Sequence, residues 1–130
     1  RQIVSAARTA IGKLRGIWSN YQAHELGANV ILSILKKSKI QTDAIDEVIM
    51  GQVLTAGQGQ NPARQAHVNA GLPVESAAWG INQVCGSGLR AVALAAQHIQ
   101  LGDGQRFLRC QDRYVLHILL YLVQFEGSHP

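Results

Sequence analysis

The sequence has few of the residues that would indicate a disulfide scaffold or a metal centre. Only two of its 130 residues are cysteines, and Cys85 and Cys110 lack the paired spacing of a zinc site. Two thiols do not form a disulfide framework either, so a reducing, cytoplasmic location is the expected one. We therefore expect no metal ion and no structural disulfide.

Charged residues and long apolar runs are also scarce. Charged residues make up 15% of the chain, and the formal net charge of +4 is not gathered into a basic patch, which argues against nucleic-acid binding. No signal peptide is visible at the N-terminus. The most apolar stretch, Val115–Phe125, contains His117 and falls well short of the roughly 20 residues that span a bilayer. We expect no association with a membrane.

The chain does have enough apolar sequence for a core, since 47% of its residues are hydrophobic. Apolar blocks separated by glycine and proline alternate between strand-like and helix-like patterns. This order predicts a layered α/β fold with a largely parallel sheet. The predicted strands are Gln2–Ala7, Asp46–Leu54 and Ala77–Val84, and the predicted helices are Ala23–Lys39, a helix from Asn61-Pro62 to about Asn69, and Leu89–Leu101.

The third predicted helix is apolar on most of its faces, which predicts that it is buried. After Gln105 the texture of the sequence changes, and Arg106–Pro130 lacks clear turn signals. Periodicity does not decide whether Val115–Phe125 is a strand or a short helix. We therefore divide the chain into a domain over residues 1–105 and an atypical tail over residues 106–130.

Cys85 is the candidate nucleophile. A nucleophilic thiol needs exposure, a setting that favours negative charge, and donors for the oxyanion that forms when it attacks a carbonyl. Cys85 lies where a predicted strand ends and a predicted helix begins, and helix N-termini carry unpaired N–H groups and partial positive charge. Gly86 and Gly88 allow a tight turn there. The alternative is a buried cysteine that acts as a small hydrophobic residue.

A partner base for this thiol is not evident in the sequence. His98 lies on the helix that follows Cys85, but thirteen residues along a helix is about 20 Å, which is too far for contact. His24 and His67 lie on other predicted helices, and nothing marks either of them as the partner of a cysteine. We interpret each histidine as a surface or packing residue.

Three segments of the chain carry distinctive motifs. They are SAARTAIGKLRG at Ser5–Gly16, GQVLTAGQGQNPARQA at Gly51–Ala66 and INQVCGSGLRAVALAAQHIQLGD at Ile81–Asp103. In this order along the chain they resemble the thiolase family, and most closely its acetyl-CoA acetyltransferases. The resemblance covers Ile3 to about Gly104. Ketoacyl synthases share the fold and the cysteine, but in them a run of serines typically follows it, so Cys-Gly-Ser-Gly fits thiolases better.

The resemblance implies a thiolase-like layered αβα fold, present here as an incomplete N-terminal half, and a ping-pong acyl transfer. Cys85 would take an acetyl group from acetyl-CoA as a thioester, and its backbone N–H would help to bind the oxyanion. A second acetyl-CoA would then give acetoacetyl-CoA, and thiolysis is the reverse reaction. Coenzyme A thioesters are the implied substrates, with no cofactor and no metal. Full-length members of the family are dimers or tetramers.

The sequence also departs from the family. The histidine that activates the nucleophile and a second catalytic cysteine lie in the family's C-terminal half, and their motifs do not occur here. Cys110, between Arg109 and Gln111, does not match that second cysteine. The loop domain that holds most of coenzyme A is missing as well. We therefore expect a truncated chain that is not competent alone, with a non-native or out-of-frame tail; the alternative is a non-catalytic remnant or partner-dependent fragment.

Overall fold

The computed structural model describes residues 2–104, 106–113 and 117–124. Three strands and three helices lie where the sequence predicts them, and two further strands follow. The elements are β1 (Gln2–Arg8), α1 (Ala23–Ser38), the short 3-10 helix η1 (Thr42–Ala44), β2 (Glu47–Gly51), α2 (Pro62–Asn69), β3 (Ala77–Ile81), α3 (Ser87–Leu101), β4 (Arg106–Arg113) and β5 (His117–Gln124).

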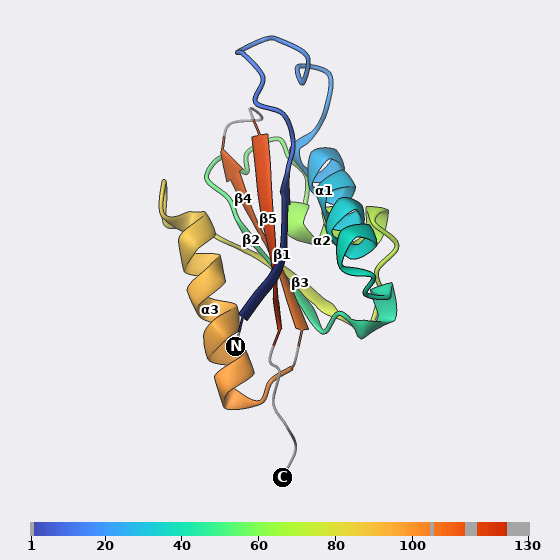
Figure 1. Ribbon diagram of the computed structural model, residues 1–130. Coiled ribbons are helices and arrows are strands. Elements are labelled where there is room, and N and C mark those ends of the chain that lie inside the picture. Colours follow the sequence, from blue (N-terminus) through green and yellow to red (C-terminus); the bar gives the residue numbers. More distant parts are fainter. Residues whose placement is uncertain (1, 105, 114–116, 125–130) are drawn as a thin grey trace.

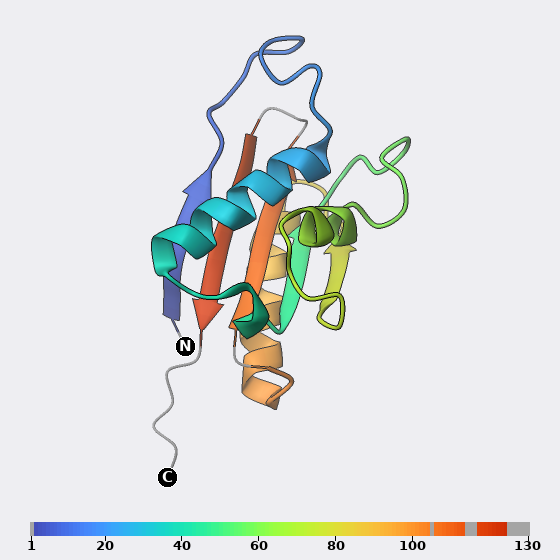
Figure 2. The same ribbon diagram turned by 90° about the vertical axis from the view of Figure 1, so that its right-hand side faces the viewer.

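The strands form one five-stranded sheet in the order β1-β5-β4-β2-β3. Strand β2 pairs in parallel with β3 and β4, whereas β5 runs antiparallel to β4 and to β1. Helices α1 and α2 cover one face of this sheet, and α3 covers the other (Figure 1). Figure 2, turned by 90°, shows α1 and α2 side by side in front of the strands, with α3 behind them. The predicted layered α/β class with parallel pairing is confirmed.

Strand β2 is covered on both of its faces, as its nearly continuous apolar sequence predicts. Successive side chains of a strand point to opposite faces of the sheet. Val48 and Met50 accordingly belong to the core under α1 and α2, and Ile49 belongs to the core under α3. All three are buried. The strand that ends beside the candidate site is therefore fixed from both sides.

The two cores differ in size. The larger one lies between the sheet and α1 and α2, and includes Leu26, Ile31 and Ile34 of α1, which are almost fully buried. The smaller one joins Ile49 of β2 to a single stripe of α3. That stripe consists of Ala91, Ala95 and Ile99.

The prediction that α3 is buried on most faces was wrong. Leu89 is 75% exposed and Leu101 is 76% exposed, because α3 packs on the sheet through one stripe only. An apolar composition all round the helix does not by itself bring a second partner to its outer face. Within the described part of the chain, the outer face of α3 is open to solvent at these two leucines.

Several predicted boundaries shift for identifiable reasons. Strand β3 ends at Ile81, three residues before the predicted end, because the chain turns there before Cys85. Helix α1 ends one residue early, since Lys39 adopts the left-handed conformation that terminates a helix. Helix α2 starts as predicted: Asn61 is its N-cap and accepts a hydrogen bond from the Arg64 N–H at 3.0 Å.

The region from residue 106 onward contributes strands to the sheet. Strand β4 lies between β2 and β5, and β5 pairs with β1. Of the two readings left open for Val115–Phe125, the described part, His117–Gln124, is a strand. Residues 115, 116 and 125 lie outside the described residues. Among the helices of the described ranges, none combines the length and apolarity needed to cross a membrane.

Candidate functional site

Cys85 lies in the turn that connects strand β3 to helix α3. The strand ends at Ile81, and the helix runs from Ser87 with Gly86 as its N-cap. Cys85 is exposed to solvent and is not in a disulfide. The thiol is therefore carried at the N-terminal end of a long helix, where the unpaired N–H groups and the positive end of the helix dipole favour negative charge.

Buried and exposed side chains divide sharply around this turn. Ser87 and Gly88, at the start of α3, are buried. Val84, which precedes Cys85, is 62% exposed, and Leu54, which follows the end of β2, is also exposed. The backbone after the thiol is thus packed into the protein, while the side chain of the residue before it is exposed.

The hydroxyl of Ser87 forms hydrogen bonds within this turn and to the residue after β2. The Gln83 N–H donates a hydrogen bond to Ser87 Oγ at 2.9 Å, and Ser87 Oγ donates to the Val84 carbonyl at 2.6 Å. The same oxygen lies 3.3 Å from the carbonyl of Gln52, the residue after β2. The side chain of Ser87, two residues after Cys85, therefore holds the backbone of the two residues before Cys85.

Gly51, the last residue of β2, lets the start of α3 approach closely. A Cβ atom at this position would lie 2.5 Å from the carbonyl carbon of Ser87 and 2.5 Å from the nitrogen of Gly88. Both are backbone atoms, so a flexible side chain cannot relieve the contact by moving. The absence of a side chain at residue 51 therefore sets how near the helix N-terminus lies to the sheet.

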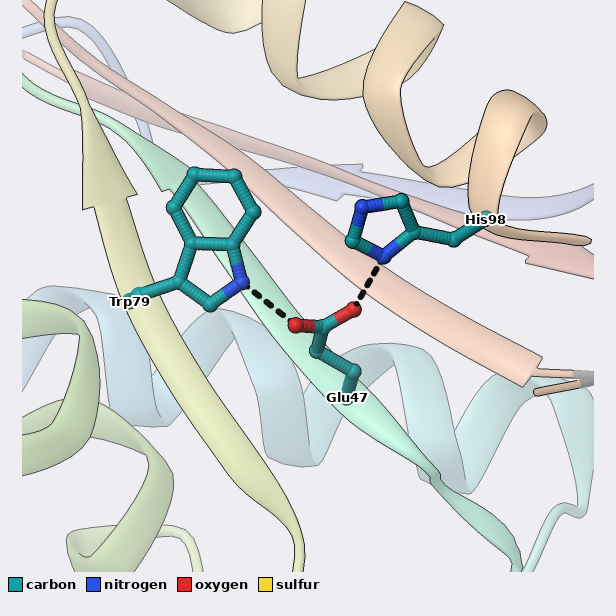
Figure 3. A network of polar contacts seen from close by, with 3 residues as sticks. All are labelled: Glu47, Trp79 and His98. Carbon is teal, nitrogen blue, oxygen red and sulfur yellow. Dashed lines mark hydrogen bonds and ion pairs between the residues drawn. The ribbon is translucent and has the colours of Figure 1, made fainter. Parts of the chain in front are cut away.

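A polar cluster lies at the other end of α3 (Figure 3). Glu47, at the start of β2, accepts a hydrogen bond from Trp79 Nε1 of β3 and contacts His98 of α3, with 2.8 Å between Glu47 Oε2 and His98 Nδ1. The cluster joins two strands and a helix on one face of the sheet. It also accounts for the partial burial of His98.

His67 belongs to a different cluster, on α2. Its ring is fully buried, with Nε2 at 2.6 Å from Ser76 Oγ. Because Ser76 Oγ donates to the Pro73 carbonyl at 3.0 Å, His67 Nε2 is the donor to Ser76 and Nδ1 is the unprotonated nitrogen. Burial and, second, the neighbouring Arg64 guanidinium lower the pKa of His67. This histidine is a neutral packing residue, as the sequence predicts.

No group of three or more metal-ligating side chains occurs among the residues that the structure describes. The side chain of Cys110 lies outside those for which contacts are described. The described histidines with identified ring partners are His67 and His98, and these partners are Ser76, Arg64 and Glu47. The structure thus places the thiol at the start of α3, and these identified contacts assign neither histidine as its base.

The sequence does not indicate that Asn82, Ser87 and Gly51 pack together around the turn. One local signal is the serine between two glycines, since a small polar residue at the first turn of a helix often bonds to nearby backbone. The contact between Gly51 and the start of α3 carried no local signal, because it joins segments more than thirty residues apart.

Comparison with known proteins identifies the family. Residues 2–110 match the model of the thiolase N-terminal domain. This range includes the strands and helices that build and carry the Cys85 turn, and it ends beyond residue 105, where the sequence analysis placed its boundary. The chain belongs to the thiolase family.

Several curated relatives of the chain are acetyl-CoA acetyltransferases. The chain is 61% identical to one from Paracoccus denitrificans and 58% identical to one from Rhizobium meliloti, each over 103 residues. It is 54% identical to the cytosolic acetyl-CoA acetyltransferase of Mus musculus over 101 residues. These alignments cover 78–79% of this chain but only 25–26% of the relatives. The chain spans about a quarter of the length of these proteins.

Proposed function

We propose that this chain carries the acyl-accepting cysteine of an acetyl-CoA C-acetyltransferase, with Cys85 as the nucleophile. The observation that supports this most directly is the exposed thiol at the N-terminal end of α3, within a region that matches the thiolase N-terminal domain. The substrates would be coenzyme A thioesters, in line with the names of the relatives.

In the first half of the reaction, Cys85 Sγ attacks the thioester carbonyl of acetyl-CoA. The bond from sulfur to carbon forms, and the carbonyl oxygen becomes an oxyanion that the backbone N–H of Cys85 helps to stabilise. The bond to coenzyme A then breaks, and the released coenzyme A takes up the proton that left the cysteine. The product is an acetyl thioester on Cys85.

In the second half, a second acetyl-CoA loses a proton from its methyl carbon to a base. The resulting carbanion attacks the acetyl thioester, a carbon–carbon bond forms, and Cys85 leaves as a thiolate that is protonated again. Acetoacetyl-CoA is released, and thiolytic cleavage is the same sequence in reverse. The bases for both halves would come from the part of the relatives that this chain does not span.

We expect the isolated chain to be inactive in complete turnover. Catalytic groups that act as a unit lose most of their effect when one is missing, and a thiol without its base and its coenzyme A site is such a case. The complete protein would be a homo-oligomer in the cytoplasm, as the family resemblance and the name of the cytosolic relative suggest.

The second candidate is a non-catalytic, partner-dependent fragment. The observation that favours it is the number of exposed apolar side chains outside the thiol turn, because extensive bare apolar surface drives association. They lie on several elements. Examples are Ile11, Leu14 and Ile17 between β1 and α1, and Leu89 and Leu101 on α3.

Acetyl transfer to Cys85 separates the two candidates. The chain with Cys110→Ser is incubated with acetyl-CoA, and the mass of the peptide containing Cys85 is then measured with and without iodoacetamide labelling. The proposal predicts a slow, single acetylation of Cys85 that hydroxylamine removes, together with protection from labelling, because exchange between thioesters needs no second substrate and the missing base slows it without preventing it. Cys85→Ser, Cys110→Ser is the matched control without a thiol. A labelled, adduct-free Cys85 would favour the non-catalytic candidate.

A further inference from the structure

Val84, the residue before the candidate nucleophile, has a backbone conformation that its side chain disfavours. Its φ angle is 49°, in the left-handed region where a β-branched residue is a genuine outlier. Among the residues that the structure describes, the other non-glycine positions with positive φ are Arg15, Lys39 and Asn61, and these three are not β-branched. Such strain persists only where the surroundings enforce it, and it concentrates at functional sites.

Two side chains enforce this conformation by holding both polar groups of the Val84 backbone. Asn82 Oδ1 accepts a hydrogen bond from the Val84 N–H at 2.9 Å. Ser87 Oγ donates to the Val84 carbonyl at 2.6 Å, and the Ser87 N–H donates to the same carbonyl at 3.1 Å. The Val84 side chain itself is largely exposed, so packing of that side chain does not hold the residue in place.

Both of these side chains are themselves tied to the segment after β2. Asn82 Nδ2 donates to the Val53 carbonyl at 3.2 Å, and Ser87 Oγ lies 3.3 Å from the Gln52 carbonyl. Ser87 is fully buried, and its backbone packs against Gly51. The residues that hold Val84 are therefore bonded to the segment directly after β2, and Ser87 also packs against the last residue of that strand.

We propose that Ser87 is a positioning residue for Cys85: its hydroxyl holds Val84 in the left-handed conformation, and that conformation sets the thiol at the N-terminal end of α3. This inference rests on the proposed function only in taking Cys85 as the nucleophile; the positioning of the thiol by Ser87 does not depend on it. If Val84 relaxed to an extended conformation, the peptide leading into Cys85 would rotate. The sulfur would then leave the positive end of the helix.

The test measures how fast iodoacetamide alkylates Cys85 in the 130-residue chain carrying Cys110→Ser. Each rate is divided by the rate for the same variant unfolded in urea, which removes differences in intrinsic chemistry. Loss of the helix setting should slow Ser87→Ala about fivefold relative to the chain that retains Ser87, because the N–H groups at the start of α3 would no longer face the sulfur as it reacts. Ser5→Ala is the control, because Ser5 is a buried serine whose hydroxyl has no partner among the described residues.

A second substitution distinguishes positioning from a general effect on folding. Asparagine tolerates the left-handed region far better than valine, so Val84→Asn should hold the turn without the serine. The double variant Ser87→Ala, Val84→Asn should react within about twofold of Val84→Asn alone. A general weakening of α3 would instead lower both backgrounds equally. If Ser87→Ala fails to fold by circular dichroism, the double variant should regain the fold.

Each possible result either supports or contradicts the positioning role of Ser87. Slowing in Ser87→Ala with rescue in the double variant supports the positioning role. A rate for Ser87→Ala equal to that of Ser5→Ala overturns it, and so does a double variant that stays slow or unfolded. The acetyl-adduct experiment is separate: a Cys85 that alkylates as expected but never acquires acetyl overturns the proposed function and leaves the role of Ser87 standing.

Discussion

The two ends of helix α3 are held against the sheet by different kinds of contact. At the thiol end, the side chains of Asn82 and Ser87 bond to backbone groups of the turn and of the segment after β2. At the far end, Glu47, Trp79 and His98 bond to one another through their side chains. Contacts to backbone fix the path of the chain, whereas contacts between side chains join elements whose paths are already regular.

This difference suits the tasks of the two ends. A reactive thiol must be exposed and yet have a defined orientation, so its own side chain cannot supply the contacts that hold it. The neighbouring backbone supplies them instead. The far end only has to keep the helix on the sheet, which a half-buried carboxylate with two donors can do. Substitutions at each end of α3, and one at a residue outside the helix, test whether the two ends are held independently.

Gly51→Ala should lower the free energy of unfolding most, because residue 51 contacts the start of α3 at the thiol end. The added Cβ would lie 2.5 Å from backbone atoms of Ser87 and Gly88, and overpacking of this kind costs about 3 kcal/mol of the free energy of unfolding. Urea denaturation followed by circular dichroism measures this. The matched control is Gly57→Ala, where a Cβ meets no atom within 4 Å but φ is 73°, so only a strain of about 1 kcal/mol is expected. Equal losses of unfolding free energy in the two variants would contradict a close contact between Gly51 and the start of α3.

The second largest effect on the free energy of unfolding should be its dependence on pH through His67, which lies on α2 and not on α3. Burial first, and Arg64 second, lower the pKa of His67 from its ordinary 6.5. As the pH falls below 6.5, the unfolded chain binds a proton that the folded chain refuses, so stability is lost until the lowered pKa is passed. The slope from this group is at most about 1.4 kcal/mol per pH unit.

His67→Gln isolates this contribution, because glutamine can still donate to Ser76 and does not titrate. The free energy of unfolding of the two proteins is measured by urea denaturation between pH 7 and pH 5. We expect the difference between them to change in favour of the variant as the solution becomes more acidic. A difference that stays constant over this range would contradict a neutral, buried His67.

Glu47→Gln should have the smallest effect and should spare the thiol. The substitution removes the charge facing His98 but keeps an acceptor for Trp79, and the partly exposed pair predicts a loss of about 1 kcal/mol. Glu75→Gln, at an exposed carboxylate, is the matched control, with an expected change below about 0.5 kcal/mol. Iodoacetamide alkylation of Cys85 should not change in either variant. A slower reaction in Glu47→Gln would mean that the two ends of α3 are not independent.

Much of the fold could be predicted from local patterns. The apolar run in β2, the apolar rows of α1 and the Asn61-Pro62 helix start depend on neighbours in sequence, and each lies within the element predicted for it, although β2 ends at Gly51 and not at Leu54. The place of Cys85 between a strand and a helix is equally local. The non-native origin of residues 106–130 stays a prediction, since the two strands that they contribute do not bear on where the sequence came from.

Contacts between distant segments could not be predicted in this way. Glu47 meets residues 32 and 51 positions away, and no pattern within a window of ten or fifteen residues can indicate such a pair. The strained conformation of Val84 is another example, because valine by itself argues against it. Only the surrounding bonds, which exist once the sheet has formed, make it the stable arrangement.

The sequence alone determined the alternation of strands and helices, the family to which its segments are similar, and the position of a cysteine at a helix start, since all of these reside in short stretches of residues. The order of the strands, the open outer face of α3 and the clamp around Val84 were decided only by tertiary structure. They depend on which surfaces meet after folding, and free energy from burial and from long-range hydrogen bonds selects that arrangement.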